Sequence, residues 1–149
     1  MTIKQTYELL KFIDEYTYPT GSAAYGLPSP SDNDRFCTKP TYDQIAGMAK
    51  NYGMLPVQDS GYDGTSRTLL LSVAGQSFHI FHVPDKDILT LNAVTEMVKT
   101  AATLFPAAMG KKAFRVLLFR QLRDLLTMMN GESGSGVTCG TIPVERKAE

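Results

Sequence analysis

Cysteine is scarce in this sequence, since its 149 residues include only Cys37 and Cys139. The two stand far apart and match no spacing typical of a metal site, so a zinc-binding module is not indicated. Isolated cysteines are typical of free thiols in a reducing compartment, and we expect no disulfide between them. At this length, with 43% hydrophobic residues, one domain can instead bury a sizeable core.

An excess of charge of either sign is also absent. Fifteen Lys and Arg residues balance fifteen Asp and Glu residues, which gives a formal net charge of zero. Proteins that bind nucleic acids generally carry an excess of Lys and Arg, so the composition does not indicate that class. A local basic face on a chain of zero net charge remains an alternative.

Long apolar runs are absent as well. The first sixteen residues carry charges at Lys4, Glu8, Lys11, Asp14 and Glu15. We therefore expect no signal peptide, no association with membranes and a cytoplasmic location.

The pattern that is present predicts an α+β domain. Helical spacing of apolar residues indicates helices at 3–15, 41–53, 87–104 and 111–129, and one helical turn at 22–25. Strands are expected at 17–19, 32–38, 54–57, 67–73 and 77–83, with a polar turn or loop at 58–66. We expect a mixed, mostly antiparallel sheet flanked by helices over residues 1–129, followed by a flexible Gly/Ser-rich tail at 130–149.

Residues 21–34 carry most of the chemical information. Gly21 and Ser22 open a turn of small residues, which lets a backbone approach a phosphate closely. Asp32 and Asp34 follow a proline-containing loop, and their side chains share one face if the segment is a strand. Two carboxylates on one face can hold a hard cation. A phosphate-binding turn followed by a metal-binding pair is what nucleotidyl transfer requires.

The stretches TGSAAYG at 20–26 and SDND at 31–34 resemble the signature of the DNA polymerase beta superfamily of nucleotidyltransferases. That signature is a strand, a Gly-Ser turn, a loop of about this length and an Asp-x-Asp strand. The small stand-alone members of bacteria and phages are most similar, and the order of elements extends the resemblance over residues 17–126. It implies a nucleotidyltransferase-like fold, in the host cytoplasm if a phage encodes the chain.

The resemblance also implies roles for individual residues. In the family the Gly-Ser turn contacts a nucleoside triphosphate and the carboxylates hold magnesium. Carried over to this chain, Gly21, Ser22 and the neighbouring Tyr25 would bind the nucleotide. Asp32 and Asp34 would bind Mg²⁺ and act in catalysis.

Two features depart from the family pattern. Asn33 and Arg35 occupy positions that are usually apolar, and an arginine there must reach solvent or an acidic partner. Active members also supply a third carboxylate from a later strand, but the matching strand at 77–83 contains no acid. His79 stands at that position, on the face shared with Ser77 and Phe81, and we regard it as a candidate catalytic base. His82 should face the other way, and the acids that could substitute are Asp59, Asp63, Asp85 and Asp87.

Basic residues are concentrated near the end of the chain. The last predicted helix carries Lys111, Lys112, Arg115, Arg120 and Arg123. They form either a solvated helix face or a set from which one or two residues bind a triphosphate or an RNA backbone. Lys39 and Arg67 are similar candidates, and Lys39 follows the Asp-x-Asp strand directly.

These features leave three hypotheses. The first is a minimal nucleotidyltransferase that transfers a nucleoside monophosphate, with Mg²⁺, to a hydroxyl of a protein, an RNA or a small molecule. The second is a catalytically weakened relative that binds a nucleotide or a partner protein. The third is an interaction protein without phosphate chemistry.

Overall fold

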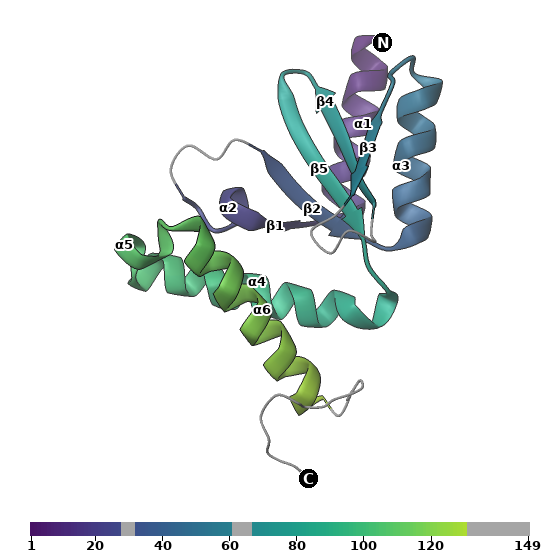
Figure 1. Ribbon diagram of the computed structural model, residues 1–149. Coiled ribbons are helices and arrows are strands. Elements are labelled where there is room, and N and C mark those ends of the chain that lie inside the picture. The colour runs from purple at the N-terminus through teal and green to yellow at the C-terminus, as the bar shows by residue number, and fades with distance from the viewer. Residues whose placement is uncertain (28–31, 61–66, 131–149) are drawn as a thin grey trace.

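The computed structural model describes residues 1–27, 32–60 and 67–130, in which helices cover both faces of a sheet (Figure 1). The elements in chain order are α1 (Ile3–Tyr16), β1 (Tyr18–Thr20), α2 (Gly21–Ala24), β2 (Asn33–Cys37), α3 (Lys39–Asn51), β3 (Val57–Ser60), β4 (Arg67–Val73), β5 (Gln76–His82), the 3-10 turn η1 (Asp85–Asp87), α4 (Ile88–Leu104), α5 (Pro106–Met109) and α6 (Lys112–Met129). No helix within these described ranges has both the length and the apolar character needed to cross a bilayer.

The sheet has the strand order β1-β2-β5-β4-β3. Only the central pair, β2 and β5, is parallel, and the other three pairs are antiparallel. The predicted α+β class with a mixed, mostly antiparallel sheet is therefore confirmed. The parallel pair matters for the site because it sets Asp34 directly beside His79.

One face of the sheet is packed against α1 and α3, which lie side by side (Figure 1). The buried residues of this cluster come from both helices and from β2, β4 and β5: Leu9, Ile13, Cys37, Tyr42, Ile45, Ala49, Leu69, Leu71, Val73, Phe78 and Ile80. Cys37 is a free thiol, and burial raises its pKa to about 12. It is therefore inert at neutral pH, whereas Cys139 lies outside the described residues.

The opposite face is covered by α4, at its β1 end. The Thr20 and Thr95 hydroxyls lie 2.9 Å apart and hydrogen-bond β1 to α4. On the same face the Phe36 ring contacts Tyr18 and Phe81, with ring centroids 5.4 and 6.1 Å away. Farther along this face Leu70, His79 and Phe81 are half-buried.

A second cluster joins the helical layer to the turn after β1. Tyr25, Val94, Val98, Ala102 and Met109 are its buried members, and side chains on the inner side of α6 pack against them. α6 crosses over α4 in Figure 1 and contacts it along the middle of both helices. The turn that contains Gly21 and Ser22 is thus packed against α4 through Tyr25.

The sequence misplaced one strand. β3 covers Val57–Ser60 rather than residues 54–57, so the first part of the predicted loop at 58–66 is strand. Its backbone pairs antiparallel with β4, from Leu70 to Arg67, and this pairing overrides the polar composition. The rest of that loop, at 61–66, and nearly all of the predicted tail, at 131–149, lie outside the described residues.

Two further differences concern helices. α3 begins at Lys39 rather than Thr41, with Pro40 in its first turn, a position that proline favours because its missing N–H has no partner there anyway. The short helix α5 was not predicted, and it likewise starts at a proline, Pro106.

Candidate functional site

The candidate site starts at Gly21, between β1 and α2. Its φ of +75° lies in the left-handed region that favours glycine. A Cβ at this position would collide with the carboxylate of Asp34 and would lie only 3.1 Å from its Cβ and Cγ. Gly21 is therefore needed both for the backbone conformation and for the close approach of Asp34, which pairs across the sheet with Thr20.

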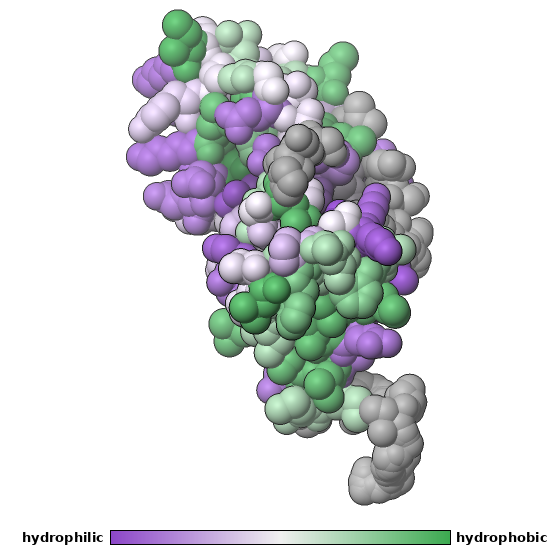
Figure 2. Space-filling view, turned by 90° about the vertical axis from the view of Figure 1, so that its left-hand side faces the viewer, coloured by the Kyte–Doolittle hydropathy of each residue, from purple (hydrophilic) through white to green (hydrophobic). Residues whose placement is uncertain are grey.

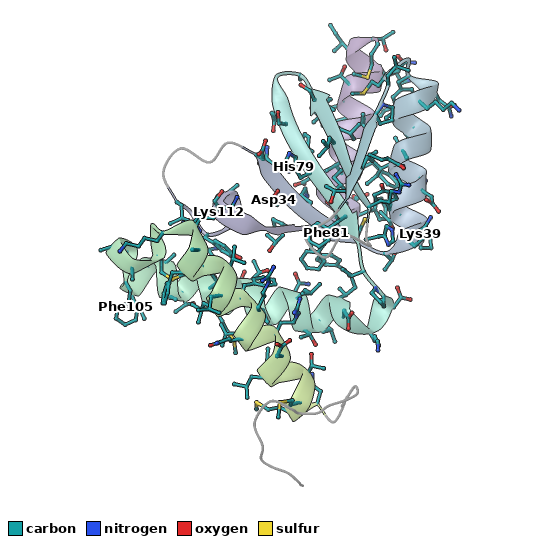
Figure 3. All side chains as sticks on the ribbon, viewed as in Figure 1. Asp34, Lys39, His79, Phe81, Phe105 and Lys112 are labelled. Atoms are coloured by element: carbon teal, nitrogen blue, oxygen red, sulfur yellow. The ribbon has the colours of Figure 1, made fainter. Side chains whose placement is uncertain are left out.

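Asp32, Asp34 and His79 form the centre of the site, and Figure 3 shows Asp34 and His79 on neighbouring strands. His79 is the register partner of Asp34 in the parallel β2–β5 pair. Its Nδ1 lies 3.6 Å from Oδ1 of Asp34, and its Nε2 lies 3.6 Å from Oδ1 of Asp32. One imidazole thus faces both carboxylates, and the predicted convergence of these three residues is what the structure contains.

Burial and charge act against each other at Asp34. Burial raises the pKa of this carboxyl above its usual value, and the nearby charge of Asp32 raises it further. His79 and Lys112 lower the pKa of Asp34, but they do not offset the burial. The Asp34 carboxylate is thus only partly compensated by positive charge.

Lys112 and Arg115, two of the five basic residues considered at the end of the chain, act on this region. Lys112 is the first residue of α6, and its positive charge lowers the pKa of Asp34 (Figure 3). Arg115 lowers the pKa of Tyr25 and donates a 2.9 Å hydrogen bond from Nη1 to the carbonyl of Met109. The first turn of α6 therefore brings positive charge to the side of the site where α2 lies.

Tyr25 supports the turn from beneath. It is only 8% exposed and belongs to the cluster around α4. Burial raises its pKa, while hydrogen bonds with the Thr20 side chain and the Gly21 backbone lower it. The position of Tyr25 is that of a residue that shapes the turn rather than one that reaches a ligand.

The other two predicted nucleotide contacts lie in different places. Ser22 is half-buried in α2, next to Gly21, and its carbonyl accepts a hydrogen bond from the N–H of Leu27. Lys39 is not brought to the cluster. It lies in the first turn of α3 and pairs with Asp43 through a 2.7 Å contact (Figure 3).

The polar residues Asn33 and Arg35 have structural partners on the α1 side of the sheet. Nδ2 of Asn33 donates to the carbonyl of Ser77 and links β2 to β5. Arg35 donates from Nη2 to the carbonyls of Thr17 and Asp14, at 2.9 and 3.4 Å, and from Nε to the Thr17 hydroxyl. The arginine thus caps the C-terminal end of α1. Burial lowers the pKa of Arg35, and the charge of Asp14 raises it, so Asp14 is the acidic partner that was expected, while the cap was not predicted.

The remaining candidate residues lie away from the cluster. His82 contacts the Tyr42 ring edge-on, with centroids 4.9 Å apart, on the α3 side of the sheet, as its alternation with His79 predicts. Asp85 and Asp87 lie in η1, beyond the C-terminal end of β5. The side chain of Asp59 and all of Asp63 lie outside the described part of the chain.

A hollow of about 420 Å³ adjoins the cluster on the β4 side, and we call it the β4–β5 hollow. Its lining is Met54, Leu55, Pro56, Leu70, Leu71, Ser72, Ser77, Phe78 and His79. Its described lining contains no lysine, arginine or carboxylate, so His79 lies between this lining and the charged cluster. The sequence analysis placed Ser77 on the same face as His79, but it gave no signal that residues 54–56, before β3, also line the hollow.

Two carboxylates and an imidazole define what the site can bind. Among residues 1–27, 32–60 and 67–130, no group of three or more His, Cys, Asp or Glu side chains is arranged to hold a metal. Mg²⁺, however, is often held by one or two carboxylates, with the remaining ligands supplied by water and phosphates. The pair Asp32 and Asp34 meets that smaller requirement.

Comparison of the chain with protein-family models, with curated proteins and with solved structures finds no match in any of the three. The resemblance to nucleotidyltransferases therefore rests on the sequence motif at residues 20–34 and on the order of elements.

Proposed function

We propose that the chain is a minimal nucleotidyltransferase that binds a nucleoside triphosphate with Mg²⁺ and transfers the nucleoside monophosphate to an acceptor hydroxyl. The observation that carries this proposal is the convergence of Asp32, Asp34 and His79 beside the Gly21 turn. The scaffold is then a nucleotidyltransferase-like fold, consistent with the strand order and with the site at the parallel pair.

Positive charge supports the placement of the triphosphate. The Gly21–Ser22 turn offers backbone without a side chain in the way, and Lys112 lies on the same side of the carboxylates. A lysine next to a small-residue turn can bind phosphate oxygens as a point charge, without the planar guanidinium of an arginine. In this proposal the triphosphate occupies the α2–α6 side of the site.

The carboxylate pair fits a hard cation. Burial is the main reason that the pKa of Asp34 is raised, and the nearby negative charge of Asp32 adds to it, so a bound cation would relieve both costs. When bound, Mg²⁺ neutralises charge on the phosphates and polarises them toward attack. Asp32 and Asp34 are the residues that would hold it.

His79 supplies the base. Its neutral form has one ring nitrogen with a free lone pair, and the facing Asp34 carboxylate orients the ring. The acceptor oxygen attacks the α-phosphorus and loses its proton to His79. The bond from the α-phosphorus to its bridging oxygen breaks, and pyrophosphate leaves. With Nδ1 turned to Asp34, the free lone pair is on Nε2, which faces Asp32, so the acceptor hydroxyl reaches the ring from the Asp32 side.

A labelling assay tests the transfer step. α-³²P-labelled ATP, GTP, CTP and UTP are each incubated with the chain and Mg²⁺, with a protein fraction and an RNA fraction offered separately as acceptors. We expect label to reach one fraction, with a loss of about 10²-fold or more in His79→Ala and little change in His82→Ala. Label transfer that is equal in His79→Ala and wild type would contradict the role of His79.

A second candidate function is a nucleotide- or partner-binding module on the same scaffold. The presence of two carboxylates rather than three in the described part of the cluster favours it. This function predicts nucleotide binding without any label transfer to either fraction. The two candidates therefore separate in the same assay once binding has been measured.

A further inference from the structure

The outer side of α6 carries a row of exposed apolar residues. Phe114, Leu117, Leu125 and Met128 are 44%, 53%, 47% and 39% exposed, although large apolar side chains are normally buried. The inner side of the same helix already packs against α4, so α6 is apolar on two sides. Figure 2 shows green side chains gathered over the lower, helical part of the molecule. Exposed apolar residues grouped on one side of a helix are typical of an interaction site.

The row is symmetric about one residue. Phe114 and Leu117 precede Gln121 by seven and four residues, and Leu125 and Met128 follow it by four and seven. Positions four and seven residues apart lie on one side of an α-helix, so all five residues form a single stripe. We call this set, with Gln121 at its centre, the α6 stripe.

Such symmetry suits an antiparallel copy of the same helix. A two-fold interface brings one surface against itself, so each residue must tolerate its symmetry mate. If two α6 helices cross antiparallel at Gln121, Phe114 faces Met128 of the other copy, and Leu117 faces its Leu125. The two Gln121 side chains then meet each other, amide against amide.

Charge at the edge of the stripe is self-complementary too. Arg120 and Asp124 flank one side of it, one residue before and three residues after Gln121. In the antiparallel arrangement, Arg120 of one copy comes within about 3 Å along the axis of the position of Asp124 in the other, at 1.5 Å per residue. Opposite charges therefore face each other twice across the pair.

We propose that the α6 stripe is the interface through which this chain pairs with a second copy of itself, with the two-fold axis at Gln121. Met97, Leu104 and Phe105, in or next to α4, are exposed as well. Lys112 and Arg115 lie on the other side of α6 from the stripe, as the helical spacing requires. Pairing therefore leaves the Asp32–Asp34–His79 cluster accessible.

The mass in solution tests this pairing. Sedimentation or light scattering of the full chain at about 1 to 100 µM should give twice the monomer mass of 16.4 kDa. Leu117→Glu/Leu125→Glu should halve the mass, and circular dichroism checks that the variant is folded. A wild-type chain that is monomeric throughout, or a dimer that this double variant leaves intact, would overturn the proposal.

Two further variants define the geometry. Arg120→Glu should weaken the dimer because it places like charges opposite Asp124, and Arg120→Glu/Asp124→Arg should restore it. In a Cys139→Ser background, Gln121→Cys should form an intermolecular disulfide under oxidation, whereas Arg123→Cys, on the opposite side of α6, should not. Equal cross-linking of the two cysteine variants would contradict the antiparallel arrangement.

Discussion

At the scale of single residues, the contact between Gly21 and Asp34 is the tightest constraint on the site. Gly21 and Gly26 have the same φ of +75°, but a Cβ on Gly26 would have nothing within 4 Å. Comparison of the two glycines therefore separates backbone strain from the collision with Asp34.

We expect Gly26→Ala to lower the free energy of unfolding by about 1 kcal/mol, the usual cost of a left-handed alanine. Gly21→Ala should cost about 1–3 kcal/mol more, because the side chain of Asp34 has to move. Urea unfolding measures both free energies. An equal loss in the two variants would mean that Asp34 does not pack against this turn.

A second prediction follows from the raised pKa of Asp34. The folded chain holds the Asp34 proton more tightly than the unfolded chain does, so ionisation of this carboxyl destabilises the fold. That cost is absent below the ordinary pKa of 3.8 and grows as the pH rises through the higher folded-state value. Asp34→Asn should therefore unfold at a higher temperature than wild type at pH 7, by an amount that shrinks toward pH 4.

Thermal unfolding followed by circular dichroism between pH 4 and 7 measures this difference. Asp43→Asn is the control, because Asp43 is an exposed partner of Lys39, and its loss should change stability by about 0.5 kcal/mol or less. A wild type more stable than Asp34→Asn at pH 7 would show that the carboxylate is already well compensated in the folded chain.

The residue scale is also where sequence reasoning reached farthest. Strand alternation and the Asp-x-Asp spacing were enough to expect Asp32 and Asp34 on one face, and the resemblance to nucleotidyltransferases supplied the expectation that His79 lies opposite them. They could not choose Lys112 from five basic residues, because that choice depends on how α6 crosses α4. They also could not show that Lys39 turns toward Asp43, since both an ion pair and a ligand contact suit an exposed lysine.

At the scale of elements, Arg35 links β2 to the end of α1. Its guanidinium satisfies carbonyls that the helix leaves without a partner, and these charge-assisted hydrogen bonds are partly shielded from water. Arg35→Met should lower the free energy of unfolding by about 1–3 kcal/mol. Lys39→Met, which removes an exposed ion pair, should cost about 0.5 kcal/mol.

Urea unfolding of the two variants checks this prediction. A loss in Arg35→Met no larger than that in Lys39→Met would mean that water satisfies the end of α1 equally well. An arginine at position 35 does not by itself predict this cap. The cap forms only because β2 lies beside the C-terminal end of α1 in the folded chain.

Helices and most strands were predictable because their apolar spacing is regular. α1, α4 and α6 differ from their predicted bounds by one residue at most at each end. β3 was misplaced because its residues are polar, and only the presence of β4 beside them makes a strand. Pairing between distant segments is the part that local patterns do not contain.

At the scale of the whole molecule, the site lies between two regions that differ in charge. The first turn of α6 brings positive charge to the α2 side, and the β4–β5 hollow, whose described lining carries no lysine, arginine or carboxylate, lies on the other side of His79. This division follows from the strand order, which sets β5 between β2 and β4. The fold class could be predicted from the order of elements, but the division could not.

The most direct test of the phosphate- and metal-binding account is isothermal titration of ATP, GTP, CTP and UTP with and without Mg²⁺. We expect at least one of them to bind only with Mg²⁺ and to lose binding in Asp32→Asn/Asp34→Asn. Lys112→Met should weaken the affinity about tenfold, or ~1.4 kcal/mol, while Lys39→Met should leave it unchanged. Binding that needs no Mg²⁺, binding that survives in Asp32→Asn/Asp34→Asn, or no binding of any of the four would contradict the account.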